Sequence, residues 1–210
     1  MHQNSTRLAA AAIGLAVLAA ASVALAQGAP PVRIRGDIEK IDGNTVVVKT
    51  REGKQETVKL ADNVRVMAFV PAKLADIKPN SYIGVTADPQ PDGSQRAIAI
   101  HIFTEAQRGV GEGHRPWDLR PGTTMTNAAV ETTVAGVDGQ TITVKYKAGD
   151  REGQQKVIVP SSATIVAYAA GEKSELKPGA HIIIFGATRE PDGTLQTPAI
   201  SVGRGIAPPM

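Results

Sequence analysis

The feature that most constrains this fold is an internal duplication. A segment from about Val32 to Phe103 matches a segment from about Val130 to Val202 at four places, in the same order. GDIEKIDGNTVVVKT matches TTVAGVDGQTITVKY, VKLADNVRVMAFV matches VIVPSSATIVAYA, LADIKPNSYIGV matches SELKPGAHIII, and PDGSQRAIAIHI matches PDGTLQTPAISV. The second match aligns one aromatic residue with another, Phe69 with Tyr168. The chain is therefore expected to contain two similar structural units.

Each copy has the pattern of a small β unit. In the first copy VRIRGDIEKI alternates apolar and polar residues, and the Asp42-Gly43 turn leads into the β-branched run TVVVKT. ETVKL, VRVMAFV, SYIGVTA and RAIAIHIF read as further strands, with a helical turn or ordered loop at PAKLADIKPN. About six short strands in this order favour a closed Greek-key barrel of the OB type.

We therefore predict an all-β protein with two tandem six-stranded OB-like barrels. The first would span residues 27–103 and the second residues 130–210, with an ordered linker at 104–129. Each copy holds enough valine and isoleucine for a modest core, and contact between the copies is expected to help stability.

The N-terminus has the features of a secretory signal peptide. Arg7 precedes the alanine-rich run AAAAIGLAVLAAASV, which ends in Ala24-Leu25-Ala26 before a polar stretch. Small residues at these positions suit a signal peptidase, so we predict removal of residues 1–26 by cleavage after Ala26. A retained membrane anchor is the alternative. No second apolar run approaches the roughly 20 residues of a spanning helix. The mature chain is expected in the periplasm, without a membrane span.

Composition narrows the classes of site. The chain has no cysteine, which excludes thiolate metal sites, cysteine nucleophiles and disulfides. Its formal net charge is +3 with no basic block, and aromatic residues make up only 3% of it. OB-type barrels bind single-stranded nucleic acid through aromatic platforms and basic grooves. We therefore expect no nucleic-acid partner.

The turn motifs also carry a family resemblance. Both copies have an IDGNTVVVKT-like hairpin, an LKPG-like loop and a closing PDG hairpin. With these motifs the two copies resemble a bacterial family of exported OB-like small β-barrels, catalogued as a domain of unknown function. The resemblance implies an exported envelope protein that is not an enzyme. Because turns and strand patterns carry it, the resemblance concerns the fold more than any activity.

No pattern typical of a catalytic site is present. The sequence lacks G-x-S-x-G, H-E-x-x-H, phosphate-loop and dinucleotide-binding motifs. Of its four histidines, His2 leaves with the signal peptide, and His101 alternates with apolar neighbours and is expected to point out of its barrel. The Asp-Gly pairs are turn residues. We expect neither enzymatic activity nor a cofactor.

The linker holds the only tryptophan, Trp117, within GEGHRPWDLRPG. A connection of this length inside a compact protein is usually functional or disordered, and a tryptophan rarely stays fully exposed. Trp117 either plugs the seam between the barrels or presents a platform to a partner or a sugar ring. Trp117 can serve both roles if the linker forms one wall of a groove between the barrels. The candidate binding residues are Trp117, His114, Arg115 and Asp118.

Metal binding is a second possibility. His101, His114 and Glu105 offer nitrogen and oxygen ligands, and Glu112, Asp118 and His181 add further donors. None of these residues has the close spacing that is typical of a dedicated metal site.

These observations favour a periplasmic, non-enzymatic binding or interaction module of the cell envelope. Its partner would be an envelope protein or a small ligand that the sequence does not identify. The alternative is a periplasmic metal-binding or metal-transport accessory protein. A carbohydrate or lipid binder with a cavity inside a barrel is a third hypothesis.

Overall fold

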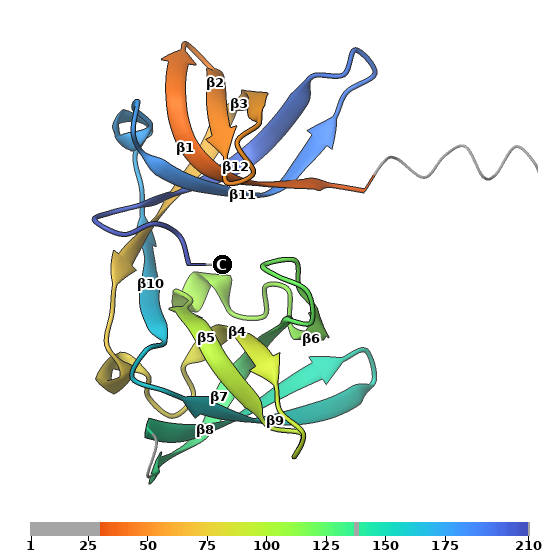
Figure 1. Cartoon of the computed structure of the whole chain (residues 1–210), viewed down its shortest axis with the longest axis vertical. Helices are drawn as coiled ribbons and strands as arrows, with labels where there is room; N and C mark the ends of the chain where they lie inside the picture. The colour runs from red at the N-terminus through yellow and green to blue at the C-terminus, as the bar shows by residue number, and fades with distance from the viewer. Residues whose placement is uncertain (1–29, 137–138, 210) are drawn as a thin grey trace, which may run out of the picture.

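The chain forms β-strands throughout the part that the structure describes. The structure is a computed structural model, and it describes residues 30–136 and 139–209. Strands dominate these residues and the helical segments are single 3-10 turns, so the expected all-β class is confirmed (Figure 1). The strands are β1 (Val32–Asp42), β2 (Thr45–Thr50), β3 (Gln55–Pro71), β4 (Tyr82–Pro89), β5 (Gln95–Ile102), β6 (Gly113–Pro116), β7 (Thr124–Gly136), β8 (Gly139–Ala148), β9 (Arg151–Val159), β10 (Thr164–Ala170), β11 (His181–Arg189) and β12 (Leu195–Gly203). The 3-10 turns are η1 (Leu74–Asp76), η2 (Glu105–Gln107) and η3 (Lys173–Glu175).

Five strands close into a first barrel, the upper one in Figure 1. β1 pairs with β2 and β11, β2 with β3, and β11 with β12, all antiparallel. β12 then returns to β3 as a parallel neighbour and closes the ring. Alternate residues of each strand face inward, as the sequence alternation predicts. The largest fully buried side chains of this core are Ile38, Leu60, Ile182, Ile184, Leu195 and Ile200.

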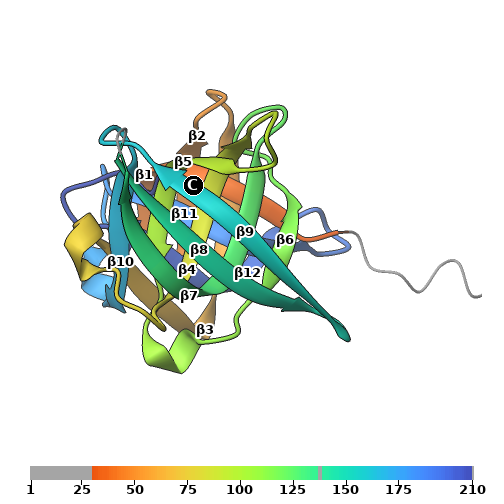
Figure 2. The ribbon, with the colours of Figure 1, turned by 90° about the horizontal axis from the view of Figure 1, so that it is seen from below.

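Five other strands close into a second barrel, the lower one in Figure 1. β4 pairs with β5 and β7, β7 with β8, and β8 with β9. A short parallel contact between β5 and β9, at Gln95–Arg96 and Val157–Ile158, closes the ring. Figure 2 shows this barrel in front, with the long β8–β9 hairpin projecting beyond it. The interior is again aliphatic, with Ile83, Ile100 and Ile142 as its largest fully buried members.

The two barrels differ from the tandem six-stranded barrels that the duplication predicts. Each has five strands: in the first copy the segments ETVKL and VRVMAFV run together as the single strand β3, and in the second copy β10 stays separate and pairs with β3 and β5 outside the ring. Each barrel also combines both copies: β1–β3 close with β11 and β12, and β7–β9 close with β4 and β5. β3 leaves the first barrel toward the second, and β10 returns beside it (Figure 1). Because the copies share one strand pattern, each copy can complete the other's barrel as well as its own.

The crossing of β3 and β10 relates the two copies by an approximate two-fold axis. Phe69 pairs directly with Tyr168 in this antiparallel ladder, and their ring centroids lie 4.4 Å apart. The duplication aligns these same two residues. The parallel pairs β3–β12 and β10–β5 are counterparts on either side of the crossing. The aromatic positions that match in sequence therefore contact each other.

A hydrophobic cluster between the barrels, which we call the seam, joins them. It draws on both barrels, on the crossing strands and on the connection between β5 and β7. Phe69 is fully buried in it. The seam comprises Phe69, Met125, Val166 and Ile183, with the partly buried Trp117, Tyr168, Phe185 and Ile206 packed against them.

Two expectations concern residues beyond those described. The signal peptide at residues 1–26 lies outside the described residues, as does Asp138 of the second copy's first turn. Cleavage after Ala26 and the periplasmic location therefore stay predictions. Within residues 30–136 and 139–209, no helix has the length and apolarity needed to cross a membrane.

Candidate functional site

The connection between β5 and β7, residues 104–123, is an ordered strap on the second barrel. It begins with the turn η2 and continues as β6, which pairs antiparallel with the start of β7. The loop after β6 is closed by the backbone N–H of Trp117, which donates to the Thr123 carbonyl at 2.8 Å. The Thr123 hydroxyl donates back to the Trp117 carbonyl at 3.1 Å. These bonds fix the position of the tryptophan.

Trp117 lies at the seam, beneath arginines of the first barrel. The Arg33 guanidinium carbon is 3.8 Å from the centroid of the indole ring. Those of Arg35, also on β1, and of Arg115, on β6, lie at 5.9 and 5.5 Å. A guanidinium over an indole face is a favourable cation–π contact. The ring is therefore covered by the chain itself, which is the arrangement expected of a plug between barrels.

Asp118 ties the strap to the first barrel. Its carboxylate lies 2.6 Å from Arg33 and 2.7 Å from Arg35. Burial alone would raise the pKa of the Asp118 carboxyl, but the hydrogen bonds from the two arginines outweigh it and hold that pKa below its usual value. The charges of Asp118 and its two arginine partners are thus largely engaged with one another.

The other two strap candidates are also engaged. His114 Nδ1 lies 2.8 Å from the Thr126 hydroxyl, and burial, followed by the charge of Arg115, lowers the pKa of its imidazole. Arg115 donates to the Gly111 carbonyl at 2.7 Å. Burial, followed by the charge of Arg33, lowers the pKa of the Arg115 guanidinium. The strap residues predicted as a binding site therefore lie near one another but mainly fasten the strap.

His101 points out of its own barrel, as expected, but the seam buries it. Only 3% of the residue is exposed, and its ring packs edge-on against Phe103 and Tyr168 at 4.7 and 5.6 Å. Burial, with the charge of Arg115, lowers the pKa of the His101 imidazole to about 3. Its Nδ1 has no hydrogen-bond partner among the described residues.

The residues considered for a metal site do not come together. His101 is buried in the seam, His114 bonds Thr126, and Glu105 lies on the surface in an ion pair with Arg108. In the described part of the chain, no three histidine or carboxylate side chains are grouped as metal ligands would be. The geometry gives the metal hypothesis no support.

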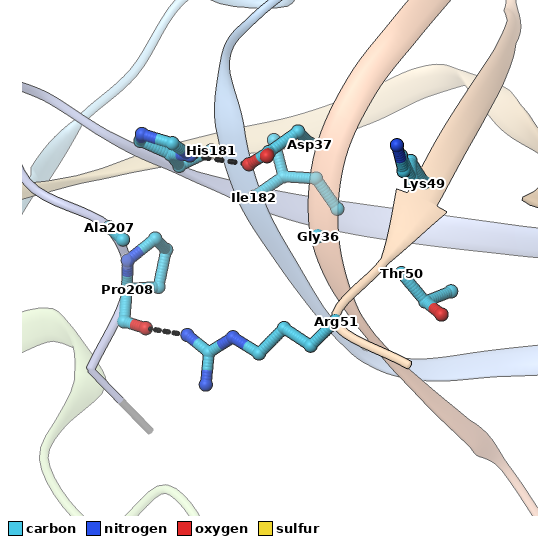
Figure 3. A pocket seen from close by; sticks show the side chains of 9 residues that line it. All are labelled: Gly36, Asp37, Lys49, Thr50, Arg51, His181, Ile182, Ala207 and Pro208. Atoms are coloured by element: carbon cyan, nitrogen blue, oxygen red, sulfur yellow. Dashed lines mark hydrogen bonds and ion pairs between the residues drawn. The ribbon is translucent and has the colours of Figure 1, made fainter. Parts of the chain in front are cut away.

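A hollow of about 410 Å³ opens on the first barrel beside the C-terminal tail, residues 204–208 (Figure 3). The tail leaves β12 and passes beside the start of β11 and the middle of β1 to Arg51, which follows β2. A second depression, of about 890 Å³, lies along the tail and shares His181 and Ala207 with the hollow. The hollow is lined by Gly36, Asp37, Lys49, Thr50, Arg51, His181, Ile182, Ala207 and Pro208.

Charged side chains form a row across the floor of the hollow. Asp37 on β1 pairs in register with Lys49 on β2 and with His181 on β11. The Asp37 carboxylate forms an ion pair with His181 Nδ1, drawn as a dashed line in Figure 3. Lys49 is exposed, and its ammonium has no ion-pair or hydrogen-bond partner among the described residues.

Arg51 links the hollow to the tail. Its guanidinium donates to the Pro208 carbonyl at 2.6 Å (Figure 3). Burial, followed by the neighbouring charge of Arg35, lowers the pKa of the Arg51 guanidinium. A guanidinium whose hydrogen-bond acceptor among the described residues is a neutral carbonyl favours a nearby anion. The hollow can therefore accept a carboxylate or phosphate group.

Sequence reasoning missed the hollow. His181 was considered only as one further donor for a metal site, and Lys49 lies in an ordinary strand. Arg51 and Pro208 are 157 residues apart and meet only because β11 and β12 close the first barrel. No local pattern could have found it, because the lining residues come from four separate segments of the chain.

The strap and the hollow thus differ in how their charges are arranged. In the strap the opposite charges pair with each other, whereas in the hollow a cation stays unpaired. Comparisons with protein-family models, with curated proteins and with solved structures found no match for this chain.

Proposed function

We propose that this chain is an exported, non-enzymatic binding module of the cell envelope that recognises an anionic group in the hollow. The observation that carries the proposal is that the exposed Lys49 ammonium and the Arg51 guanidinium line the same open volume. His181 adds a third basic group. Charge-assisted hydrogen bonds to carboxylate or phosphate are among the strongest that side chains make.

The hollow suits this role better than the tryptophan strap. Trp117 is covered by Arg33, and Asp118 already pairs with Arg33 and Arg35. An incoming ligand would have to break these contacts. At the hollow a ligand needs only to replace water around Lys49 and to compete with one neutral carbonyl for Arg51.

The same geometry supports a binding role over catalysis. The Asp37–His181 pair resembles the orienting half of a catalytic triad, but the second ring nitrogen of His181 has no hydroxyl or thiol partner among the described residues. His101 packs among aromatic rings and is closed off from solvent. Neither histidine is placed to activate a nucleophile.

The test is an NMR titration of the exported chain with citrate and with inorganic phosphate. We expect shifts of the backbone amides to concentrate at Lys49, Arg51 and His181. Lys49→Ala should weaken binding about tenfold, as the loss of one charge-assisted contact predicts. Comparing the affinities for citrate and for phosphate shows whether the hollow prefers a carboxylate or a phosphate group.

Lys40→Ala is the matched control, because it removes the same charge from an exposed position of β1 that does not line the hollow. Uniform small shifts, or equal effects of the two lysine variants, would show only nonspecific attraction and would overturn the proposal.

A further inference from the structure

We infer that the first barrel binds an extended acidic segment of a partner protein, laid through the hollow and added as a strand to the free edge of β1. The inference rests on the proposed function and names the class of ligand. It comes from comparing the two barrels, because the second barrel already holds such a segment, its own strap.

By their strand pairing the two barrels correspond in this region, apart from a register shift between Val32 and Ile34 in the first. Gly36 pairs with Ile182 in the first barrel as Ala128 pairs with Ile83 in the second. The next pairs along, Asp37 with His181 and Ala129 with Tyr82, also correspond. Hence β1 and β11 occupy the places of β7 and β4.

In the second barrel β6 lies beside the start of β7, whereas in the first barrel no described strand lies at the corresponding place beside β1. The first four residues of β7 pair with β4 on one side and with β6 on the other. The matching residues of β1 pair with β11, but β2 joins β1 only from Gly36 onward. At Val32–Ile34 no described strand or loop backbone bonds the second edge. An open edge of this kind accepts an extended peptide.

The strap also shows how a chain reaches that edge. Before β6, the Val110 carbonyl accepts hydrogen bonds from the Tyr82 hydroxyl at 3.3 Å and from Asn127 Nδ2 at 3.0 Å. The Glu112 carboxylate accepts the Lys147 backbone N–H at 2.9 Å. The strap thus crosses β4 and β7, places an acid at the end of β8, and turns into the added strand.

On the first barrel the corresponding path runs through the hollow. His181 stands where Tyr82 stands, and Arg51 stands at the end of β2 where Lys147 stands at the end of β8. The tail takes the place of the strap only as far as Pro208, whose carbonyl accepts from Arg51. Beyond Pro208, no described segment of the chain takes the place of the strap.

Charge decides the chemistry of the occupant. The lysine that corresponds to Lys49 in the second barrel is Lys145, which is paired with Glu131. Lys49 has no such partner, and with Arg51 it favours acidic side chains at the position that Glu112 takes on the strap. The chain's own N-terminal residues 1–29 contain no aspartate or glutamate. We therefore assign the occupant to another protein.

The experiment measures fluorescence polarisation of a labelled ten-residue peptide of alternating threonine and glutamate, added to the exported chain. A proline–glutamate repeat is the matched peptide, because it keeps the charge but cannot form a strand ladder. We expect the threonine–glutamate peptide to bind at least about tenfold more tightly than its proline counterpart. Lys49→Glu should remove this binding, and Lys40→Glu should leave it unchanged.

The outcomes separate this inference from the proposed function. Equal binding of the two peptides, weakened by Lys49→Glu, overturns strand addition but keeps anion recognition. Binding of citrate or phosphate without either peptide does the same. No binding of any anion overturns both. A homodimer that the threonine–glutamate peptide dissociates would make a second copy the occupant and overturn the assignment to another protein.

Discussion

The Arg33 guanidinium, on the first barrel, lies 3.8 Å from the ring centroid of Trp117, on the strap of the second. Asp118, the next residue, is within 2.6 Å of the same arginine. Arg33 therefore contacts both the indole face of Trp117 and the carboxylate of Asp118, which are adjacent in the strap. This contact joins the two barrels at the seam, in addition to the β3–β10 crossing.

Replacing Trp117 with alanine should destabilise the protein. We expect the free energy of unfolding to fall by about 2–4 kcal/mol, near the range for large-to-small changes at packed sites, because the ring is only partly buried. Urea unfolding followed by circular dichroism measures it. Val134→Ala, at an exposed position, should cost less than about 0.5 kcal/mol. Similar losses for both would contradict a role for Trp117 in the seam.

The fluorescence of Trp117 should be blue-shifted and insensitive to divalent metals. The indole contacts Arg33 and the seam cluster rather than bulk water, and His101 and His114 do not form a ligand set with Glu105. Emission spectra with and without zinc, copper and nickel measure both properties. Saturable quenching at micromolar metal would restore the metal-binding hypothesis.

Gly84→Ala should displace His101 from the seam. A Cβ at this position would lie 2.0 Å from the imidazole atoms Cε1 and Nε2, so the ring has to move. We expect a loss of about 1–3 kcal/mol, as for other overpacked cores. Thermal unfolding of the full chain measures it. Gly186→Ala, whose Cβ would meet only Pro31 at 3.6 Å, should be tolerated.

The companion change His101→Ala should reduce the cost of Gly84→Ala but not abolish it, because it removes the imidazole atoms that the new methyl group meets and leaves Asn127 Oδ1 at 2.7 Å. A double-mutant cycle then gives a strong coupling between the two positions. Simple addition of the two losses would mean that Gly84 is needed for another reason.

Stability should fall between pH 7 and pH 5 because of His101. Burial lowers the pKa of this imidazole to about 3, whereas an unfolded histidine has a pKa near 6.5. Between these values only the unfolded state binds the proton, so protonation favours unfolding as the pH falls. The contribution is about 2 kcal/mol over this interval. Urea unfolding at pH 7 and pH 5 should show the loss, and His101→Leu should reduce it. An unchanged pH dependence in the variant would contradict the burial.

Unfolding should occur in a single transition. Each barrel takes strands from both copies, so neither can persist when the other opens. Urea curves from Trp117 fluorescence and from far-ultraviolet circular dichroism should coincide. Val48→Ala, in the first barrel's core, should move both curves together. Two separated steps would instead indicate independently folded barrels.

The strands and turns could be predicted from the sequence, because they depend on local pattern. Alternation placed β1 and β5, and the Asp42-Gly43 pair forms the expected turn, with Gly43 at a φ of 55°. The match of Phe69 with Tyr168 also had structural meaning, since the two residues pair with each other. The partial burial of Trp117 followed from its size and apolarity.

The exchange of strands between the copies could not be predicted in this way. A strand fits its neighbours equally well whether they come from its own copy or the other, because the copies share one pattern. The pairing depends on whether the chain after Pro71 turns back to the first barrel or continues into a second one. The residues on both sides of Pro71 are compatible with both paths. The burial of His101 and the hollow at Lys49 both depend on this exchange. They were missed for the same reason.

The crossing of β3 and β10 also sets an order of events for a newly made chain. The strands β1–β3 are complete once Pro71 has emerged, yet β11 and β12, which close them into a barrel, begin only at His181. Contacts this distant in sequence form slowly, and unpaired strand edges attract other chains in the meantime. The strands β1–β3 are therefore made early but closed into a barrel last, and their open edges need protection from other chains until β11 and β12 have been synthesised.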